Sequence, residues 1–289
     1  MPPIMPRPTL THAARPATYE VDALNERGET VPTPIAGEHP LTLYLDKREV
    51  VTLMTLGGAP EALAIGYLRN QRLLKSVDEI AAVQVDWETD SVVVTTHGGD
   101  FWDRQGIEDK LSKRTVTTGC GQGTVFGDLM DEIDQVSLPG EARLSEEVLY
   151  AVMDKVRKYE SIYKQAGAVH GCALCANGTS GAERGDILMF VEDVGRHNAV
   201  DAIAGQMWLD SQGGADKIFY TTGRLTSEMV IKCAQMGIPF LLSRSGLTQM
   251  GHSIAERVGI TMIGRCQGKH YLLFTGKQRF TKTNQTDYA

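Results

Sequence analysis

The sequence has few cysteines, no long apolar run and no recognisable export signal. Its five cysteines are an odd number, which does not suit a framework of paired disulfides. No window approaches the roughly 20 apolar residues of a membrane-spanning helix, and the N-terminus lacks the charged, apolar and small-residue order of a signal peptide. These absences predict a cytoplasmic protein with reduced thiols and no membrane partner.

The sequence also has fewer basic than acidic residues. The chain has 29 lysines and arginines against 36 acidic residues, a formal net charge of -7. Binding of DNA or RNA draws on basic patches that neutralise phosphates. Nucleic acid is therefore not an expected partner, and any bound nucleotide is expected to be a small molecule in a local pocket.

Proline is concentrated at the N-terminal end, where eight of the eleven prolines precede Leu41. This composition, with little apolar periodicity, predicts that residues 1–40 form a loose arm. Alternation at Leu41–Leu45, a proline suited to a helix start at Pro60, and β-branched runs then predict a small α+β domain over residues 41–97.

Glycines and charges break every pattern between Gly98 and Gly140, which predicts a mobile loop region over residues 98–143. Ser145 then caps an amphipathic helix, and strands alternate with helices to about residue 279, before a tail over residues 280–289. Such alternation indicates a mostly parallel sheet covered on both faces. We therefore expect an α/β protein whose second domain, residues 144–279, has three layers.

Three successive strands of this expected sheet each end close to an arginine: Gly223-Arg224, Ser243-Arg244 and Gly264-Arg265. Ligands of such sheets gather at the carboxyl ends of the strands, and arginine forks match phosphate oxygens. The three arginines predict a site for a phosphate-bearing ligand. The turn Gln267-Gly268-Lys269 would close over this site. The alternative is that these arginines are solvated loop residues.

The cysteines fall into different settings. Cys120 lies between two glycines in the expected loop, where it is either a reactive thiol or a surface residue without a role. His170, Cys172 and Cys175 have metal-ligand residue types without a second matching pair, so they form a zinc site or pack at the end of a buried segment. Cys233 and Cys266 suit the core and the pocket rim, respectively.

A dense polar turn runs from Glu192 to Asn198 and leads into a helix. It offers an acid, a base, a cation and a helix cap in one segment. It is either catalytic or a structural network that joins the helix to the sheet.

Several segments together resemble one family, that of the formate dehydrogenase accessory sulfurtransferases. The resemblance runs from about Leu41 to Gly276 and includes His170, Cys172, Cys175 and Ser243-Arg244-Ser245. Its most specific parts are the segments Asp193-Val194-Gly195-Arg196-His197-Asn198-Ala199-Val200-Asp201, Gly223-Arg224 with Ser227-Glu228-Met229, and Thr118-Gly119-Cys120-Gly121.

The resemblance implies a homodimer that accepts sulfur from a cysteine desulfurase and passes it to the bis-molybdopterin guanine dinucleotide cofactor of formate dehydrogenase. Cys120 would carry the sulfur as a persulfide. No cofactor would be bound permanently, because the dinucleotide is the acceptor. Its binding residues would be Gly223, Arg224, Ser243, Arg244, Arg265, Cys266, Gln267, Gly268, Lys269 and His270.

The resemblance also implies a C-terminal domain that is similar to the cytidine deaminases. Zinc deaminases need a His-x-Glu and a Pro-Cys-x-x-Cys around the metal, whereas Cys172 takes the glutamate position here and the second motif is missing. Deaminase chemistry and a bound metal are therefore not expected.

One position departs from the family pattern. Many members have Cys-x-x-Cys in the loop, but the second position here is Gly123. Transfer from Cys120 alone is feasible, whereas release of sulfur through an internal disulfide needs a substitute such as Cys172, Cys175 or Cys266. Two alternatives stay open: a non-enzymatic chaperone for the cofactor, and a zinc hydrolase.

Overall fold

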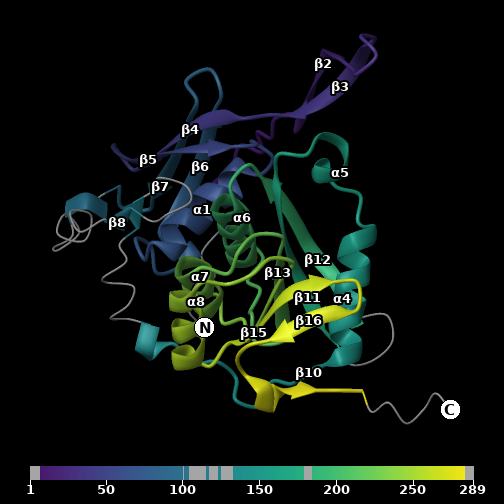
Figure 1. The fold of residues 1–289 in the computed structure, drawn as a ribbon. Coiled ribbons are helices and arrows are strands. Elements are labelled where there is room, and N and C mark those ends of the chain that lie inside the picture. The colour runs from purple at the N-terminus through teal and green to yellow at the C-terminus, as the bar shows by residue number, and fades with distance from the viewer. Residues whose placement is uncertain are drawn as a thin grey trace. The chain divides into compact units, whose positions relative to one another are not determined.

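The structure is a computed structural model that describes residues 7–99, 101–103, 115–116, 123–124, 133–178 and 184–283. Its backbone contacts divide the chain into two compact units that interleave along the sequence (Figure 1). Unit 1 comprises Met1–Leu129, Glu160–His170 and Glu192–Gln212, and unit 2 comprises Met130–Tyr159, Gly171–Val191 and Gly213–Ala289. The domains expected from the sequence followed one another in order, whereas these units each draw on three separate segments.

Unit 1 contains a five-stranded sheet in the order β1-β6-β7-β4-β5. The strands are β1 (Thr9–Leu10), β4 (His39–Leu45), β5 (Arg48–Thr55), β6 (Ile80–Asp86) and β7 (Ser91–Thr96). β4 and β5 form one antiparallel hairpin and β6 and β7 another, while β4 runs parallel to β7. Leu41, Leu43 and Leu45 alternate along β4 and are fully buried, so the period of two in the sequence marks the face that builds the core.

Helices α1 (Pro60–Asn70) and α6 (Arg196–Leu209) pack against each other in unit 1. Two glycines let their backbones meet: a Cβ at Gly66 would lie 1.7 Å from the carbonyl oxygen of Asp201, and one at Gly205 would lie 1.9 Å from that of Ala62. The Asn70 amide donates a hydrogen bond of 2.6 Å to Asp201 Oδ1 across the same contact. Most of α6 is buried, so this helix is central to unit 1.

The N-terminal region is not the loose arm that its prolines predicted. After β1, strands β2 (Thr18–Leu24) and β3 (Thr30–Ala36) form an antiparallel hairpin, and the short helix α5 (Ile162–Ala166) contacts β3. Proline removes a backbone donor, but it is compatible with an edge strand when its nitrogen faces away from the ladder. Proline content alone was therefore a misleading signal for disorder.

Unit 2 contains a six-stranded sheet in the order β12-β11-β13-β14-β15-β16. The strands are β11 (His170–Asn177), β12 (Arg184–Asp193), β13 (Lys217–Thr221), β14 (Phe240–Ser243), β15 (Thr261–Gln267) and β16 (His270–Leu273). The central strands β13, β14 and β15 are parallel, whereas β11 and β16 pair with them in antiparallel fashion. The expected parallel order therefore holds for the middle of the sheet, and β11 is a strand that the sequence analysis did not identify.

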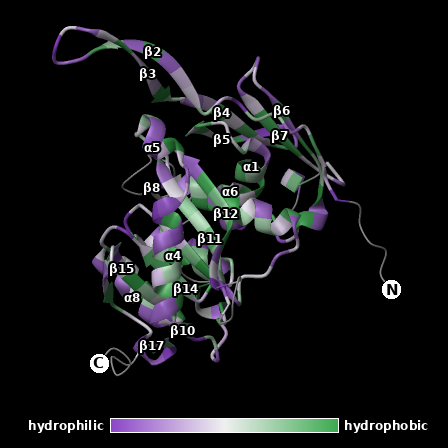
Figure 2. Cartoon of the chain, turned by 90° about the vertical axis from the view of Figure 1, so that its right-hand side faces the viewer, coloured by the Kyte–Doolittle hydropathy of each residue, from purple (hydrophilic) through white to green (hydrophobic). Residues whose placement is uncertain are grey.

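Helices cover both faces of this sheet. The apolar stripe of α4 (Glu146–Lys158) packs on the face formed by alternate residues of β11, β13 and β14. Helices α7 (Ser227–Gln235) and α8 (Gln249–Val258) lie on the other side of these strands (Figure 1). The colouring of Figure 2 shows the hydrophobic residues gathered along the strands. The expected mixed α/β fold is confirmed, while a likeness to cytidine deaminases stays a prediction.

The remaining elements are short. They are η1 (Val77–Glu79), η2 (Phe101–Asp103), β8 (Thr115–Val116), β9 (Gly123–Thr124), η3 (Ile133–Gln135), β10 (Leu144–Ser145), η5 (Lys277–Arg279) and β17 (Phe280–Thr281). β10 pairs with β17 in unit 2, and β8 pairs with β9 in the region expected to be a mobile loop. No helix among the described residues is long and apolar enough to cross a membrane.

Candidate functional site

The carboxyl ends of β13, β14 and β15 lie side by side in unit 2 and are joined by backbone hydrogen bonds. The Arg244 N–H donates to the carbonyl oxygen of Thr221 at 3.1 Å. The Arg265 N–H donates to the carbonyl oxygen of Ser245 at 2.9 Å. Each strand end is thereby fixed to its neighbour, so the three segments predicted from the sequence do form one edge.

Ser243 is the buried support of this edge. Its hydroxyl donates to the Gly223 carbonyl oxygen at 2.6 Å and accepts from the Ser245 N–H at 2.8 Å. The Gly223 N–H in turn donates to Thr221 Oγ1 at 3.1 Å. Because these groups form hydrogen bonds with one another, they hold the loops in place. A direct contact of Ser243 with a ligand stays a prediction.

Three exposed arginines, which we call the strand-end arginines, stand on this edge: Arg224, Arg244 and Arg265. No carboxylate among the described residues forms an ion pair with any of them. Arg265 has a φ of 55°, a left-handed conformation that is uncommon for residues other than glycine. Three like charges held together without a described counter-charge form a site suited to an anion.

The turn between β15 and β16 carries the other predicted contacts. Gln267, Gly268, Lys269 and His270 are exposed, and the Lys269 carbonyl oxygen accepts a hydrogen bond of 3.3 Å from the Tyr150 hydroxyl. Cys266 differs from its neighbours, because the register shift of β15 between Gly264 and Gln267 brings its side chain into the same core beneath α4 as Ile263. The turn is thus open to a ligand, whereas the structure places Cys266 away from the rim.

The four thiols in the described part of unit 2 are buried, and three of them have raised pKa values. Burial raises the pKa of Cys175 and of Cys266 to about 12 in each case, and it raises the pKa of Cys233 well above its ordinary value. We call these three residues the buried thiols. A thiol, rather than a thiolate, is the form present at neutral pH, and the thiolate is the nucleophile and the metal ligand.

Cys172 and Cys175 do not act as a pair. They are separated by an odd number of positions along β11, so their side chains lie on opposite faces of the sheet. Cys172 contacts Thr221 Oγ1 at 3.4 Å, while Cys175 belongs to the core beneath α4. No group of three metal-binding side chains occurs among the residues that the structure describes.

Cys120, the predicted sulfur carrier, lies outside the described residues. The described strands on either side of it are β8 and β9, which pair through Thr115 with Thr124 and Val116 with Gly123. Its role as the carrier therefore stays a prediction from the sequence.

The polar turn that follows β12 forms a structural network in unit 1. The Asp193 carboxylate is buried and accepts hydrogen bonds from the Thr55 hydroxyl at 2.5 Å and the Leu56 N–H at 3.1 Å. It also accepts from the Gly195 N–H at 3.1 Å and the Asn198 amide at 2.8 Å. Burial raises the pKa of Asp193, and these four donors oppose that shift. The network joins β5 to the start of α6.

Fold and site together define a mixed α/β protein with a cationic edge at the ends of its parallel strands. The sequence model of the FdhD/NarQ family matches residues 36–281. The chain therefore belongs to the FdhD/NarQ family.

Its relatives include proteins named sulfur carrier protein FdhD. The one from Listeria monocytogenes is 27% identical over 255 residues, covering 88% of this chain and 94% of the relative. The one from Bacillus subtilis is 28% identical over 243 residues, covering 84% of this chain and 88% of the relative. A crystal structure described as a formate dehydrogenase accessory protein, from Desulfotalea psychrophila, matches 91% of this chain and 98% of its own with a TM-score of 0.69 at 25% identity.

Proposed function

We propose that this chain is a sulfur carrier that serves the maturation of formate dehydrogenase. Family membership and the names of its relatives support this role. The single structural observation that carries the proposal is the edge in unit 2 where the strand-end arginines stand together. A carrier needs such a docking place for an anionic acceptor as well as a reactive thiol.

Cys120 supplies the thiol in this proposal. Its thiolate attacks the outer sulfur of a persulfide on a cysteine desulfurase, the donor's sulfur–sulfur bond breaks, and the donor leaves as a thiolate. Cys120 then holds the sulfur as a persulfide. The buried thiols support this assignment by exclusion, because their raised pKa values leave them protonated at neutral pH.

The acceptor is the bis-molybdopterin guanine dinucleotide cofactor of formate dehydrogenase. Its pyrophosphates match the strand-end arginines, which bind phosphate oxygens in a bidentate manner. The exposed turn Gln267-Gly268-Lys269 flanks the same edge and adds a lysine. These residues position the acceptor and take no part in the transfer of sulfur. The homodimer implied by the resemblance belongs to this proposal too.

Release of the carried sulfur as sulfide requires two electrons. In a loop with two cysteines the second thiol supplies them and forms a disulfide, but Gly123 stands at that position here. The reducing thiol must therefore be another cysteine or an external thiol. Replacing Cys172, Cys175 and Cys266 together tests these three as the internal substitute, since unchanged turnover would exclude them.

Intact-protein mass spectrometry tests the carrier role. The protein is incubated with a cysteine desulfurase and cysteine, alongside the Cys120→Ala variant. We expect a gain of one sulfur atom that a reductant removes and that the variant lacks. If neither protein gains sulfur while both bind a guanine nucleotide, the carrier role is wrong, and the alternative of a cofactor chaperone, which the missing second cysteine favours, takes its place.

Guanosine diphosphate binding tests the strand-end site separately. Arg244→Ala should weaken binding about tenfold or more, because a hydrogen bond to a charged group contributes about 1.5–3 kcal/mol. Lys277→Ala is the matched control. It removes one positive charge from η5, near the opposite end of the parallel strands, where Gly276 meets Thr261. Equal losses in both variants, measured by isothermal titration calorimetry, would mean that only overall charge matters.

A further inference from the structure

The hairpin formed by β2 and β3 in unit 1 has one apolar face left uncovered. Its cross-strand pairs Tyr19 with Ile35 and Ala23 with Val31 stand on one face, together with Val21. The four large side chains of this face are 40–44% exposed. An isolated two-stranded hairpin is marginally stable, and a third strand or a helix over its apolar face is the usual remedy.

The ladder of this hairpin fixes which backbone groups point outward. The Asn25 N–H donates to the Glu29 carbonyl oxygen at 3.0 Å, and the Gly37 N–H donates to the Ala17 carbonyl oxygen at 2.9 Å. Odd-numbered residues of β2 therefore form the hydrogen-bonded pairs, since such pairs alternate in an antiparallel ladder. The even-numbered residues turn their N–H and C=O groups away from the partner strand.

The two outer edges of the hairpin consequently differ. On β3 the outward positions include Pro32 and Pro34, which have no N–H, and α5 contacts this strand. On β2 the outward positions are Thr18, Glu20, Asp22 and Leu24. Within the described residues, the N–H and C=O groups of these four residues have no hydrogen-bond partner. Only the β2 edge is able to accept another strand.

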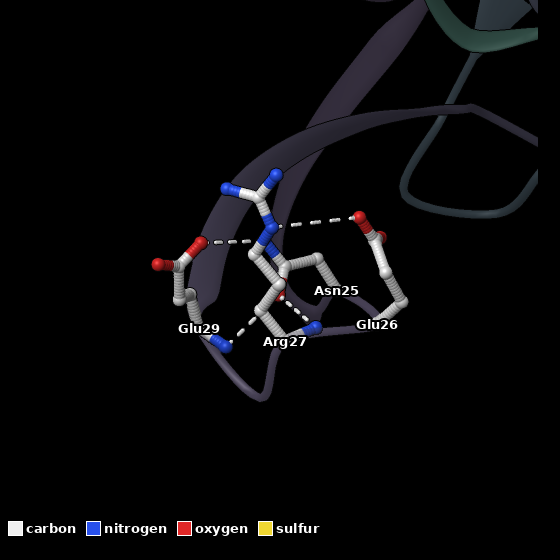
Figure 3. Close-up of polar contacts among 4 residues, drawn as sticks. All are labelled: Asn25, Glu26, Arg27 and Glu29. Carbon is white, nitrogen blue, oxygen red and sulfur yellow. Dashed lines mark hydrogen bonds and ion pairs between the residues drawn. The ribbon is translucent and has the colours of Figure 1, made fainter.

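Side-chain contacts hold the hairpin at its base and at its tip. At the base, the Tyr19 hydroxyl lies 3.1 Å from His39 Nε2, and the two rings pack edge to face. At the tip, Asn25 Oδ1 accepts hydrogen bonds from the N–H groups of Arg27 and Glu29, as Figure 3 shows. A strand held at both ends is preorganised, so a partner would not have to order it on binding.

Charge identifies the kind of partner. Residues 18–36 contain four acidic side chains and one arginine, which gives 1 − 4 = −3. Glu20 and Asp22 stand next to each other on the face opposite the apolar one. A second copy pairing in antiparallel fashion along this edge would place Glu20 or Asp22 opposite an acidic residue in each central register, and like charges in that position are destabilising.

We propose that the β2 edge binds an extended, cationic segment of a partner protein, which adds to the hairpin as a third strand. Lysine or arginine at alternate positions of this segment pairs with Glu20 and Asp22, and apolar residues between them cover Tyr19 and Val21. Acidic residues also protect edges against aggregation, but protection alone does not account for the apolar face on the other side.

A labelled, acetylated peptide of alternating lysine and valine is the probe, and fluorescence anisotropy with the full-length protein is the measurement. The control peptide alternates glutamate with valine. We expect the lysine peptide to bind, with an affinity that falls as salt is added, and the glutamate peptide not to bind. Equal binding of the two peptides would overturn the proposal.

Two variants separate strand addition from charge. Asp22→Asn keeps the outward N–H and removes the charge, whereas Asp22→Pro removes both and copies the arrangement of Pro32 on β3. We expect Asp22→Pro to bind about tenfold more weakly than Asp22→Asn. Leu24→Pro against Leu24→Ala repeats the comparison without a charge change, in case Asp22→Pro alters the circular dichroism spectrum. Equal affinities within both pairs would exclude strand addition.

Sedimentation velocity tests whether a second copy of the chain, instead of a cationic segment, binds the β2 edge. If the protein self-associates and Asp22→Pro or Leu24→Pro dissociates it, the edge binds a second copy, and the proposal of a cationic partner is wrong.

Discussion

Gly66→Ala in α1 should destabilise the protein, although the same change stabilises most helices. A new Cβ would lie 1.7 Å from the carbonyl oxygen of Asp201, so α1 and α6 would have to separate by roughly 2 Å to restore van der Waals contact. Because the clash is with a backbone carbonyl, rotation of a side chain is not able to relieve it.

The expected loss is about 3 kcal/mol in the free energy of unfolding. Overpacking of this kind costs about 1–3 kcal/mol, and we take the upper end because the clash involves backbone. Stretching the hydrogen bond between Asn70 and Asp201 adds about 1 kcal/mol. The higher helix propensity of alanine offsets about 1 kcal/mol. For a chain of this size the melting temperature should fall by roughly 6–12 °C.

Thermal and urea denaturation followed by circular dichroism measure this change. Gly58→Ala is the control in the same unit, because a Cβ there meets nothing within 4 Å and the backbone is not left-handed. Combining Gly66→Ala with Gly205→Ala should cost less than the sum of the two, since one separation of the helices relieves both contacts. A neutral or stabilising effect of Gly66→Ala would show that the helices do not pack through these glycines.

Further changes probe the thiols and the Asp193 network. At pH 8 iodoacetamide should modify none of the buried thiols in the native protein, because burial raises their pKa values well above that pH. Rapid native labelling seen by peptide mass spectrometry would contradict the burial. Thr55→Val should cost about 2–3 kcal/mol in urea unfolding, because it removes a hydrogen bond to Asp193 and leaves the Gly57 N–H, now 3.2 Å from the hydroxyl, without that acceptor. Thr52→Val, on the exposed side of the same strand, removes a hydrogen bond with the Thr42 hydroxyl at 3.0 Å that is open to solvent, so it should cost less than about 1 kcal/mol. Similar losses in the two variants would count against the network.

Local sequence signals located most helices and strands of unit 2. Ser145 caps α4, as expected from the sequence, by accepting a hydrogen bond from the Val148 N–H. The strand ends with their arginines were predicted because glycine, serine and arginine follow apolar runs at regular spacing. A helix cap or a strand end is determined by a few neighbouring residues, so it can be predicted from the sequence alone.

Other features depend on residues far apart in the chain. The contact between Gly66 and Asp201 joins helices more than one hundred positions apart, and no local pattern marks it. The strand β11 contains small residues and cysteines rather than the β-branched run that usually signals a strand. The direction of the Cys266 side chain depends on the register shift of β15 between Gly264 and Gln267, which no local pattern in the sequence marks.

The interleaving of the two units bears on how the protein is made. Residues of α1 leave the ribosome about 140 positions before their partners in α6, since 205 − 66 = 139 for the two glycines. At roughly 5–20 residues per second, synthesis of the intervening chain takes on the order of ten seconds. During that time α1 is able to pack on β6 and β7, but it lacks α6, its main helical partner. We therefore expect nascent chains to expose the surface of α1 that contacts α6 until Leu209 has been translated, and to be substrates for chaperones that act at the ribosome.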